Sequence, residues 1–185
     1  GKALLEEDLR SPCTEEIAVF QAFSRIIREA SKKFVVMDTA PTGHTLLLLD
    51  ATGAYHREIA KQMDSHSIAH YTTPMMQLQN PKQTKILLVS LAETTPVLEA
   101  ASLQADLRRA GIEPWAWIIN NSIAATTVES PLLCQRANNE LKDIEVVSTI
   151  HAQRYAVVPL LKKEPLGIEK LLELNQPSFS VALLV

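Results

Sequence analysis

The sequence predicts an α/β fold with a mainly parallel sheet and helices on both faces. Short apolar runs of strand length alternate along the chain with segments whose apolar residues recur at helical spacing. The runs are continuous rather than interrupted by polar residues, which is typical of parallel strands buried on both faces. Right-handed crossovers are expected to join them. The runs cover Phe34–Met37, Ile86–Val89, Trp115–Ile119 and Tyr155–Leu160.

The helical segments begin and end at characteristic residues. Ser11 is a suitable N-cap, Pro12 suits a first turn, and the apolar residues from Ile17 to Ile27 keep helical spacing. Gly111 is expected to stop the next helix. The predicted helices therefore cover 11–33, Thr95–Ala110, Leu132 to about Ile150, and Ile168–Leu174.

A polar stretch from 64 to 82 separates the first two predicted strands. It contains Pro74, Pro81 and the pair Met75–Met76, and it shows no sustained period. We expect it to form a mobile excursion on the functional side of the sheet.

Length and composition are those of one globular domain without a strongly basic surface. The chain has 185 residues, a formal net charge of -3 and a pI near 6.0, which argues against a nucleic-acid partner. Its two cysteines, Cys13 and Cys134, cannot build a disulfide framework. No apolar stretch approaches the ~20 residues that span a bilayer, and nothing at the start resembles a signal peptide. We therefore expect a cytoplasmic protein.

Glycine spacing limits the nucleotide chemistry that the sequence can supply. The chain has five glycines, and no two have the spacing of a phosphate-binding loop or of a dinucleotide-binding turn. Any nucleotide chemistry therefore lacks its usual phosphate cradle within this sequence.

Asp38 directly follows the first apolar run, and Gly43 comes shortly after it. Ligands bind at the carboxyl ends of parallel strands, where a carboxylate can hold Mg²⁺ or its water shell. A glycine nearby lets the backbone approach a terminal phosphate. Many apolar strands also end in aspartate without a catalytic role, so the pattern alone leaves both interpretations open.

Longer strings of residues extend this interpretation. Asp38–Leu46 reads Asp-Thr-Ala-Pro-Thr-Gly-His-Thr-Leu, and further strings lie at Asp8–Glu16, Glu93–Ala100 and Trp117–Ser122. Together they resemble the arsenical pump-driving ATPases, which belong to the deviant P-loop ATPases, and in particular their C-terminal nucleotide-binding half. The resemblance implies that 1–185 form the C-terminal part of one such domain, N-terminally truncated and without its phosphate-binding loop.

The resemblance also implies ATP and Mg²⁺ as cofactors and assigns roles to particular residues. Asp38 would act on Mg²⁺ through water, and Gly43 would donate its backbone N–H toward the γ-phosphate. Asn120 would read adenine with an amide that is both donor and acceptor. Pro159 would lie in the loop that covers the adenine ring.

Cys13 and His44 match the family positions that bind As(III) or Sb(III), which serves as allosteric activator and transported ion. Thiolate is a soft ligand suited to these ions, and imidazole is a borderline one. Because His44 follows Gly43 directly, the resemblance implies that a loop sensing the γ-phosphate also moves a metalloid ligand. Without the resemblance, Cys13 reads as a small buried hydrophobic residue.

The function implied is that of a cytosolic ATPase that drives arsenite or antimonite extrusion through a membrane channel subunit, at the inner face of the membrane. The N-terminal half of the same protein would be its second partner. The segment alone is expected to be inactive, because it lacks the phosphate cradle. It is also expected to dimerise or swap through an unpaired sheet edge.

A targeting ATPase for tail-anchored proteins, or another non-transport member of the deviant P-loop ATPases, is the alternative, because the targeting relatives share the Asp38 signature. That function requires a large apolar groove, often rich in methionine, and commonly a Cys-x-x-Cys dimer site. The chain has four methionines and no such motif, which favours the arsenical pump.

Overall fold

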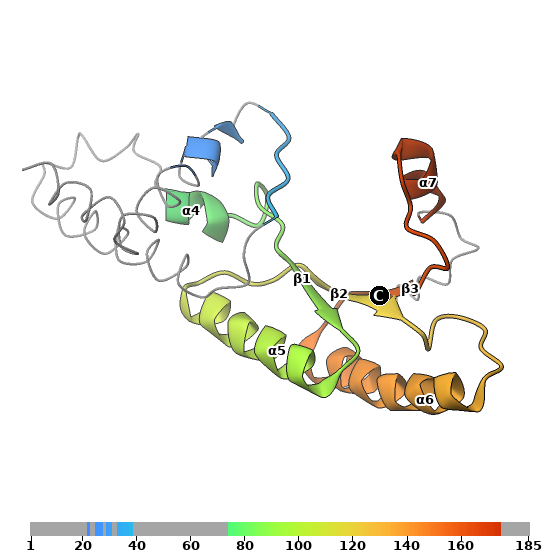
Figure 1. Cartoon of the computed structure of the whole chain (residues 1–185). Coiled ribbons are helices and arrows are strands. Elements are labelled where there is room, and N and C mark those ends of the chain that lie inside the picture. Colours follow the sequence, from blue (N-terminus) through green and yellow to red (C-terminus); the bar gives the residue numbers. More distant parts are fainter. Residues whose placement is uncertain (1–21, 23–24, 28, 31–32, 39–73, 175–185) are drawn as a thin grey trace, which may run out of the picture. The chain divides into compact units, whose positions relative to one another are not determined.

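The computed structural model describes residues 22, 25–27, 29–30, 33–38 and 74–174 (Figure 1). They belong to two compact units, one of Gly1–Thr84 with Ala110–Ile112 and the other of Lys85–Arg109 with Glu113–Val185. The sheet lies in the second unit. In chain order the elements are α4 (Pro74–Gln79), β1 (Leu87–Leu91), α5 (Thr94–Arg109), β2 (Ala116–Ser122), α6 (Pro131–Val146), a π-helical turn η2 (Val147–His151), β3 (Tyr155–Pro159) and α7 (Ile168–Glu173).

The three strands form a parallel sheet in the order β1-β2-β3. Leu87 pairs with Ala116, and Ile118 pairs with Ala156. Since consecutive strands are neighbours, right-handed crossovers place their helices on the same side of the sheet. In Figure 1, α5 and α6 lie along one side of the strands. The α/β prediction is confirmed, and helices on the second face stay a prediction.

The core of the second unit lies between the sheet and these helices. In β1 the side chains alternate, with Leu88 and Ser90 buried and Leu87 and Val89 exposed, because α5 covers one face of this strand. Burying a Leu, Ile or Phe side chain contributes roughly 1.5–3 kcal/mol. Further buried hydrophobic side chains of this core include those of Val97, Leu107, Trp117, Ile119, Val147 and Val157.

The end of α6 widens into η2 and packs against β2. The His151 ring stacks on Trp117, with 5.6 Å between the ring centroids. From α5, the amide of Gln104 donates to the His151 carbonyl at 2.9 Å. These contacts fix the last helical turn against the sheet, so the helix predicted to run to about Ile150 ends as a π turn instead of a regular α-helix.

Gly111 ends α5 as predicted. Its φ of +76° lies in the left-handed region, which glycine adopts without the strain of a Cβ. A Cβ at this position would also lie 3.2 Å from the amide nitrogen of Gln79. That amide donates to the Ala110 carbonyl at 2.7 Å, and so satisfies a carbonyl just beyond the helix end.

The prediction of a strand over Phe34–Met37 is wrong. Residues 33–38 contain no strand, and the side chains of Phe34 and Val36 are 94% and 81% exposed. An apolar run becomes a strand only where a neighbour supplies backbone hydrogen bonds, and no pairing joins this run to β1, β2 or β3.

The described part of the stretch 64–82 also differs from the prediction. It contains α4, in which Met75 and Leu78 are buried, so this part is a packed helix and not a mobile excursion. Residues 64–73 lie outside the described residues. The predicted first helix agrees with residues 22, 25–27 and 29, which are helical.

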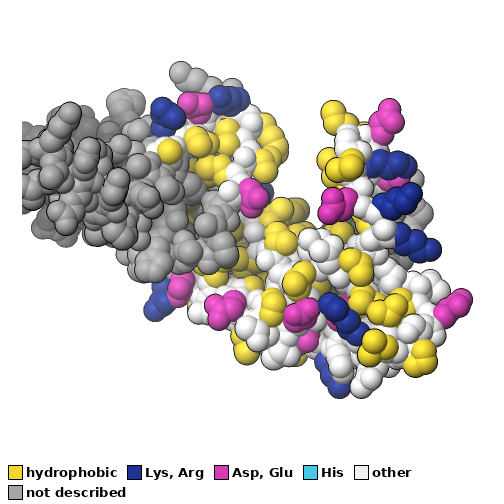
Figure 2. Space-filling model, in the orientation of Figure 1, with side chains coloured by type: hydrophobic (Ala, Val, Ile, Leu, Met, Phe, Trp, Pro, Cys, Tyr) yellow, Lys and Arg dark blue, Asp and Glu magenta, His cyan; other side chains and the backbone are white. Residues whose placement is uncertain are grey.

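The short helix α7 leaves hydrophobic side chains exposed. Ile168, Leu171 and Leu172 are all more than half exposed, and Figure 2 shows hydrophobic side chains on α7 beside charged ones. The helix therefore contributes little to the core of the second unit. Among the described helices, none combines the length and the hydropathy that a membrane crossing requires.

Candidate functional site at the carboxyl edge of the sheet

The carboxyl ends of the three parallel strands share one edge of the sheet. Asn120 pairs with Leu91 near the end of β1, and Ser122 pairs with Pro159 at the end of β3. In open α/β sheets this edge is where ligands bind. The structure therefore places Asn120 and Pro159, two residues predicted to contact adenine, at the ends of neighbouring strands.

The end of β2 departs from a regular strand at the two asparagines. The register with β3 shifts between Ile119 and Ser122, and Asn121 has a φ of +55°. Asparagine tolerates this left-handed conformation better than most residues. Beyond the shift, the Leu160 N–H donates to the Ser122 carbonyl at 2.9 Å. The half-buried Asn120 thus lies on an irregular segment of β2, and regular pairing with β3 resumes at Ser122.

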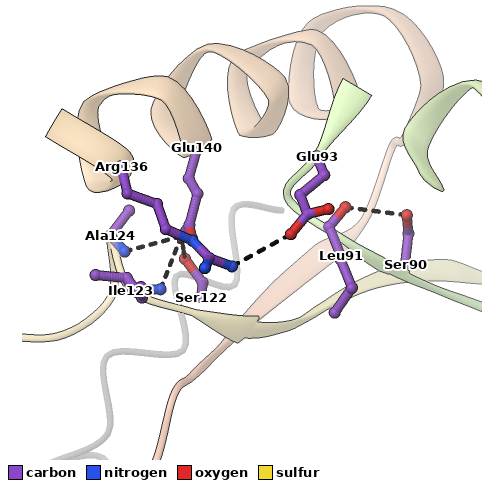
Figure 3. Close-up of polar contacts among 8 residues, drawn as sticks. All are labelled: Ser90, Leu91, Glu93, Ser122, Ile123, Ala124, Arg136 and Glu140. Carbon is purple, nitrogen blue, oxygen red and sulfur yellow. Dashed lines mark hydrogen bonds and ion pairs between the residues drawn. The ribbon is translucent and has the colours of Figure 1, made fainter. Parts of the chain in front are cut away.

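A buried carboxylate from α6 holds the loop that follows β2 (Figure 3). Oε2 of Glu140 accepts the Ser122 hydroxyl at 2.9 Å, the Ile123 N–H at 2.7 Å and the Ala124 N–H at 3.0 Å. The residue is 3% exposed. A buried charge is tolerated when donors surround it, and hydrogen bonds to a charged acceptor are stronger than neutral ones.

Arg136 connects this carboxylate to a second loop at the same edge. Its Nε lies 3.4 Å from Oε1 of Glu140, and its Nη2 lies 3.2 Å from Oε1 of Glu93. Glu93 stands between β1 and α5, and Figure 3 shows Arg136 bridging the two carboxylates. The Arg136–Glu93 pair is exposed and therefore weak by itself. The chain of contacts nevertheless joins the β1–α5 and β2–α6 loops through one helix.

A second contact joins α6 to the first residue of α5. The Thr94 hydroxyl, in the first turn of α5, donates to Oδ1 of Asp143 on α6 at 3.2 Å. Helix α6 therefore contacts two consecutive residues at the start of α5, Glu93 just before the helix and Thr94 at its first position.

Four other residues are predicted for the site. Asp38 is exposed and belongs to the first unit, while Gly43, Cys13 and His44 lie outside the described residues. Their roles, like those of Asn120 and Pro159, stay predictions. Among the residues that the structure describes, no group of three or more His, Cys, Asp or Glu side chains forms a candidate metal site.

The sequence did not single out Glu140 and Arg136. The two residues are four apart on a predicted helix, a spacing that usually indicates an exposed ion pair. Burial of Glu140 against the β2–α6 loop arises only from the tertiary packing of α6.

Comparisons with known proteins identify the family of this chain. The family model described as anion-transporting ATPase matches residues 1–76 and 49–178. An arsenical pump-driving ATPase of Acidiphilium multivorum is 75% identical to this chain over 174 residues, and two of Escherichia coli are 72% and 71% identical. Each match covers 94% of this chain, which spans 30% of the length of these relatives. The resemblance predicted from the motifs is confirmed, and the chain belongs to the anion-transporting ATPase family.

Proposed function

We propose that this chain is part of the C-terminal nucleotide-binding half of an ATPase that couples ATP hydrolysis to arsenite or antimonite extrusion. Family membership supports the ATPase activity, and the names of the relatives support the arsenical pump. The observation that carries the proposal is the position of Asn120 and Pro159 at the ends of adjacent parallel strands, since this edge is the ligand-binding edge of such sheets.

In this proposal the second unit binds the adenine base. The Asn120 amide offers a donor and an acceptor, which matches the adjacent amino group and ring nitrogen of adenine. Pro159, the last residue of β3, would stand where the loop that covers the ring begins. A site that hydrogen-bonds its ligand rejects analogues lacking the matching group, because its own polar atoms are then left unpaired.

Two residues of the Asp38–Leu46 string would act on the phosphates. Asp38 is exposed and carries a carboxylate suited to Mg²⁺ or its bound water. Gly43 presents a backbone N–H to the γ-phosphate. Bound Mg²⁺ would supply charge neutralisation on the phosphates.

The metalloid acts through Cys13 and His44, which bind As(III) or Sb(III) as activator and transported ion. The adjacency of His44 and Gly43 supports a coupling in which loss of the γ-phosphate changes the metalloid site. Soft thiolate ligands favour these ions over the hard cations of the cytosol.

The complete ATPase would work in the cytoplasm, docked at the inner face of the membrane on a channel subunit. It would act together with the N-terminal half of the same protein and without nucleic acid. This chain alone would not hydrolyse ATP, because no phosphate-binding loop is present in its sequence. It would also dimerise or swap through its sheet edge.

Sb(III)-stimulated ATP hydrolysis by the complete ATPase that carries this chain tests the proposal. Asp38→Asn removes the charge that acts on Mg²⁺ and is expected to lower the stimulated rate about tenfold or more. Glu99→Gln, an equal charge change at an exposed position on α5, serves as the control and leaves the rate unchanged. A stimulated rate equal in all three proteins would overturn the proposal. An ATPase that Sb(III) does not stimulate would instead favour a targeting ATPase.

A further inference from the structure

We propose that Glu140 is a positioning residue for base recognition: it sets the conformation of the β2–α6 loop so that Asn120 presents its amide to adenine. The inference rests on the proposed adenine-binding function of this edge. It adds a residue that neither the sequence motifs nor the family resemblance indicates, and a contact network that connects it to a second loop.

Three hydrogen-bond donors converge on one oxygen of Glu140. Oε2 of Glu140 accepts a hydroxyl and two consecutive backbone N–H groups, at 2.9, 2.7 and 3.0 Å. Two consecutive N–H groups can meet one acceptor only in a tight turn, because in an extended strand they point to opposite sides. The carboxylate therefore selects the turn that follows Asn121.

This turn directly follows the irregular end of β2. Asn121 has a positive φ, and the register with β3 shifts between Ile119 and Ser122. The segment that carries Asn120 still pairs with Leu91 of β1, but it loses its regular pairing with β3 at the point where its orientation would matter for a ligand. It is held from one side by the Leu160 N–H on the Ser122 carbonyl, and from the other by Glu140.

An uncharged amide cannot replace the carboxylate of Glu140. Both oxygens of Glu140 accept hydrogen bonds, Oε2 from the loop and Oε1 from Nε of Arg136. Glutamine has one accepting atom and would turn its NH₂ group either to Arg136 or to the loop. Each choice sets donor against donor, so Glu140→Gln keeps the shape of the side chain but releases one of the two contacts.

Photolabelling of the complete ATPase by 8-azido-ATP, quantified on peptides from 113–174, tests the inference. Competition by ATP and by inosine triphosphate measures base discrimination, since inosine lacks the amino group of adenine. Competition by tripolyphosphate measures phosphate binding alone. Glu140→Gln is expected to lower the ratio of the inosine to the adenine half-inhibition concentrations about fivefold, and Ser122→Ala about twofold. Tripolyphosphate competition stays unchanged.

Glu145→Gln is the matched control, since it makes the same charge change at an exposed position on α6 and is expected to leave the ratio unchanged. An unchanged ratio in soluble Glu140→Gln protein, or an equal loss for all three competitors, would overturn the inference. If Glu140→Gln does not fold, Ser122→Ala decides in the same way. Asn120→Ala separates the two proposals. If it leaves the ratio at the wild-type value, the adenine assignment itself fails. If it lowers the ratio while Glu140→Gln does not, only the role of Glu140 is rejected.

Discussion

The carboxylate of Glu140 accepts the backbone N–H of Ile123 at 2.7 Å, across 17 positions of the chain. One residue lies in α6 and the other in the loop that leaves β2. Replacing a whole buried ion pair by apolar residues is often neutral for stability, so burial of a charge is weak evidence of a stabilising role. The contact is better explained by what it holds, the backbone after Asn120 at the carboxyl edge of the sheet.

The left-handed conformation of Asn121 predicts a characteristic order of stability among substitutions. Asparagine is tolerated at φ +55° because its short polar side chain can hydrogen-bond locally. Alanine has a Cβ but no such group, so Asn121→Ala is expected to lower the free energy of unfolding by about 1 kcal/mol. Glycine has no Cβ, and Asn121→Gly is expected to be more stable than Asn121→Ala. Thermal denaturation of the three proteins checks this order, and a glycine variant less stable than the alanine variant would contradict it.

The pair Arg108–Glu113 predicts a small pH dependence of stability. The hydrogen bonds from Arg108, with Nε to Oε2 at 2.9 Å and Nη2 to Oε1 at 2.7 Å, lower the pKa of Glu113. A lowered pKa means that the folded state binds the proton less tightly than the unfolded state. The contribution is therefore fully present above the ordinary pKa of glutamate and is lost as the pH falls through the lowered pKa.

Because both side chains are largely exposed, solvent screening keeps this contribution at about 0.5 kcal/mol or less. Glu113→Gln is expected to lower the melting temperature slightly at pH 7 and not at pH 3. The control Glu129→Gln, also exposed, removes a carboxylate elsewhere in the second unit. If the melting temperature of Glu113→Gln falls further below that of the wild type as the pH is lowered, the predicted direction of the pH dependence is wrong.

Loss of the Cys13 thiol is expected to weaken stimulation by Sb(III) more than it lowers the basal rate of ATP hydrolysis. In the complete ATPase, Cys13→Ser keeps the side-chain shape but removes a group that can ionise near neutral pH. We expect stimulation by Sb(III) to require about tenfold more metalloid, with most basal activity retained. His44→Ala is expected to have a smaller effect, since imidazole is a borderline donor. The measurement is a titration of ATPase rate with Sb(III), and identical curves for wild type and Cys13→Ser would remove Cys13 from the site.

Much of the fold of the second unit follows from local sequence patterns. The apolar runs beginning at Ile86, Trp115 and Tyr155 contain or overlap β1, β2 and β3, and Gly111 marks the end of α5. These elements are predictable because each combines strand-length burial or helical spacing with a stop signal. Phe34–Met37 has the same local pattern, but no strand among β1, β2 and β3 pairs with it. A local sequence pattern does not reveal whether a partner strand is present.

The two tryptophans show a similar limit. Alternation predicts that Trp115 and Trp117 face the same side and pack under a helix. Trp117 is 1% exposed, but Trp115 precedes β2 and is 42% exposed. Its ring is flanked by Lys85 and Arg154, with 5.9 and 5.4 Å to the ring centroid. A strand that begins one residue later than its apolar run changes the environment of the first side chain.

The candidate site was predictable in part. The family resemblance predicts roles for Asn120 and Pro159, which stay predictions, and their common edge follows from the parallel topology. Glu140 could not be identified from the sequence, because its role depends on which face of α6 packs toward the loop after β2. An Arg–Glu pair at this spacing is identical in sequence whether it is exposed or buried.

The most direct test of nucleotide binding at this edge is hydrogen–deuterium exchange of the complete ATPase with and without Mg-ADP. The account predicts slower exchange in 120–124 and 159–161, at the carboxyl ends of β2 and β3. It predicts no change around Trp115 and Arg154, at the opposite ends of the same strands. Asn120→Ala should reduce the protection of both segments. Protection confined to the opposite edge, or exchange unchanged at 120–124 while ADP is bound to this half, would contradict the account.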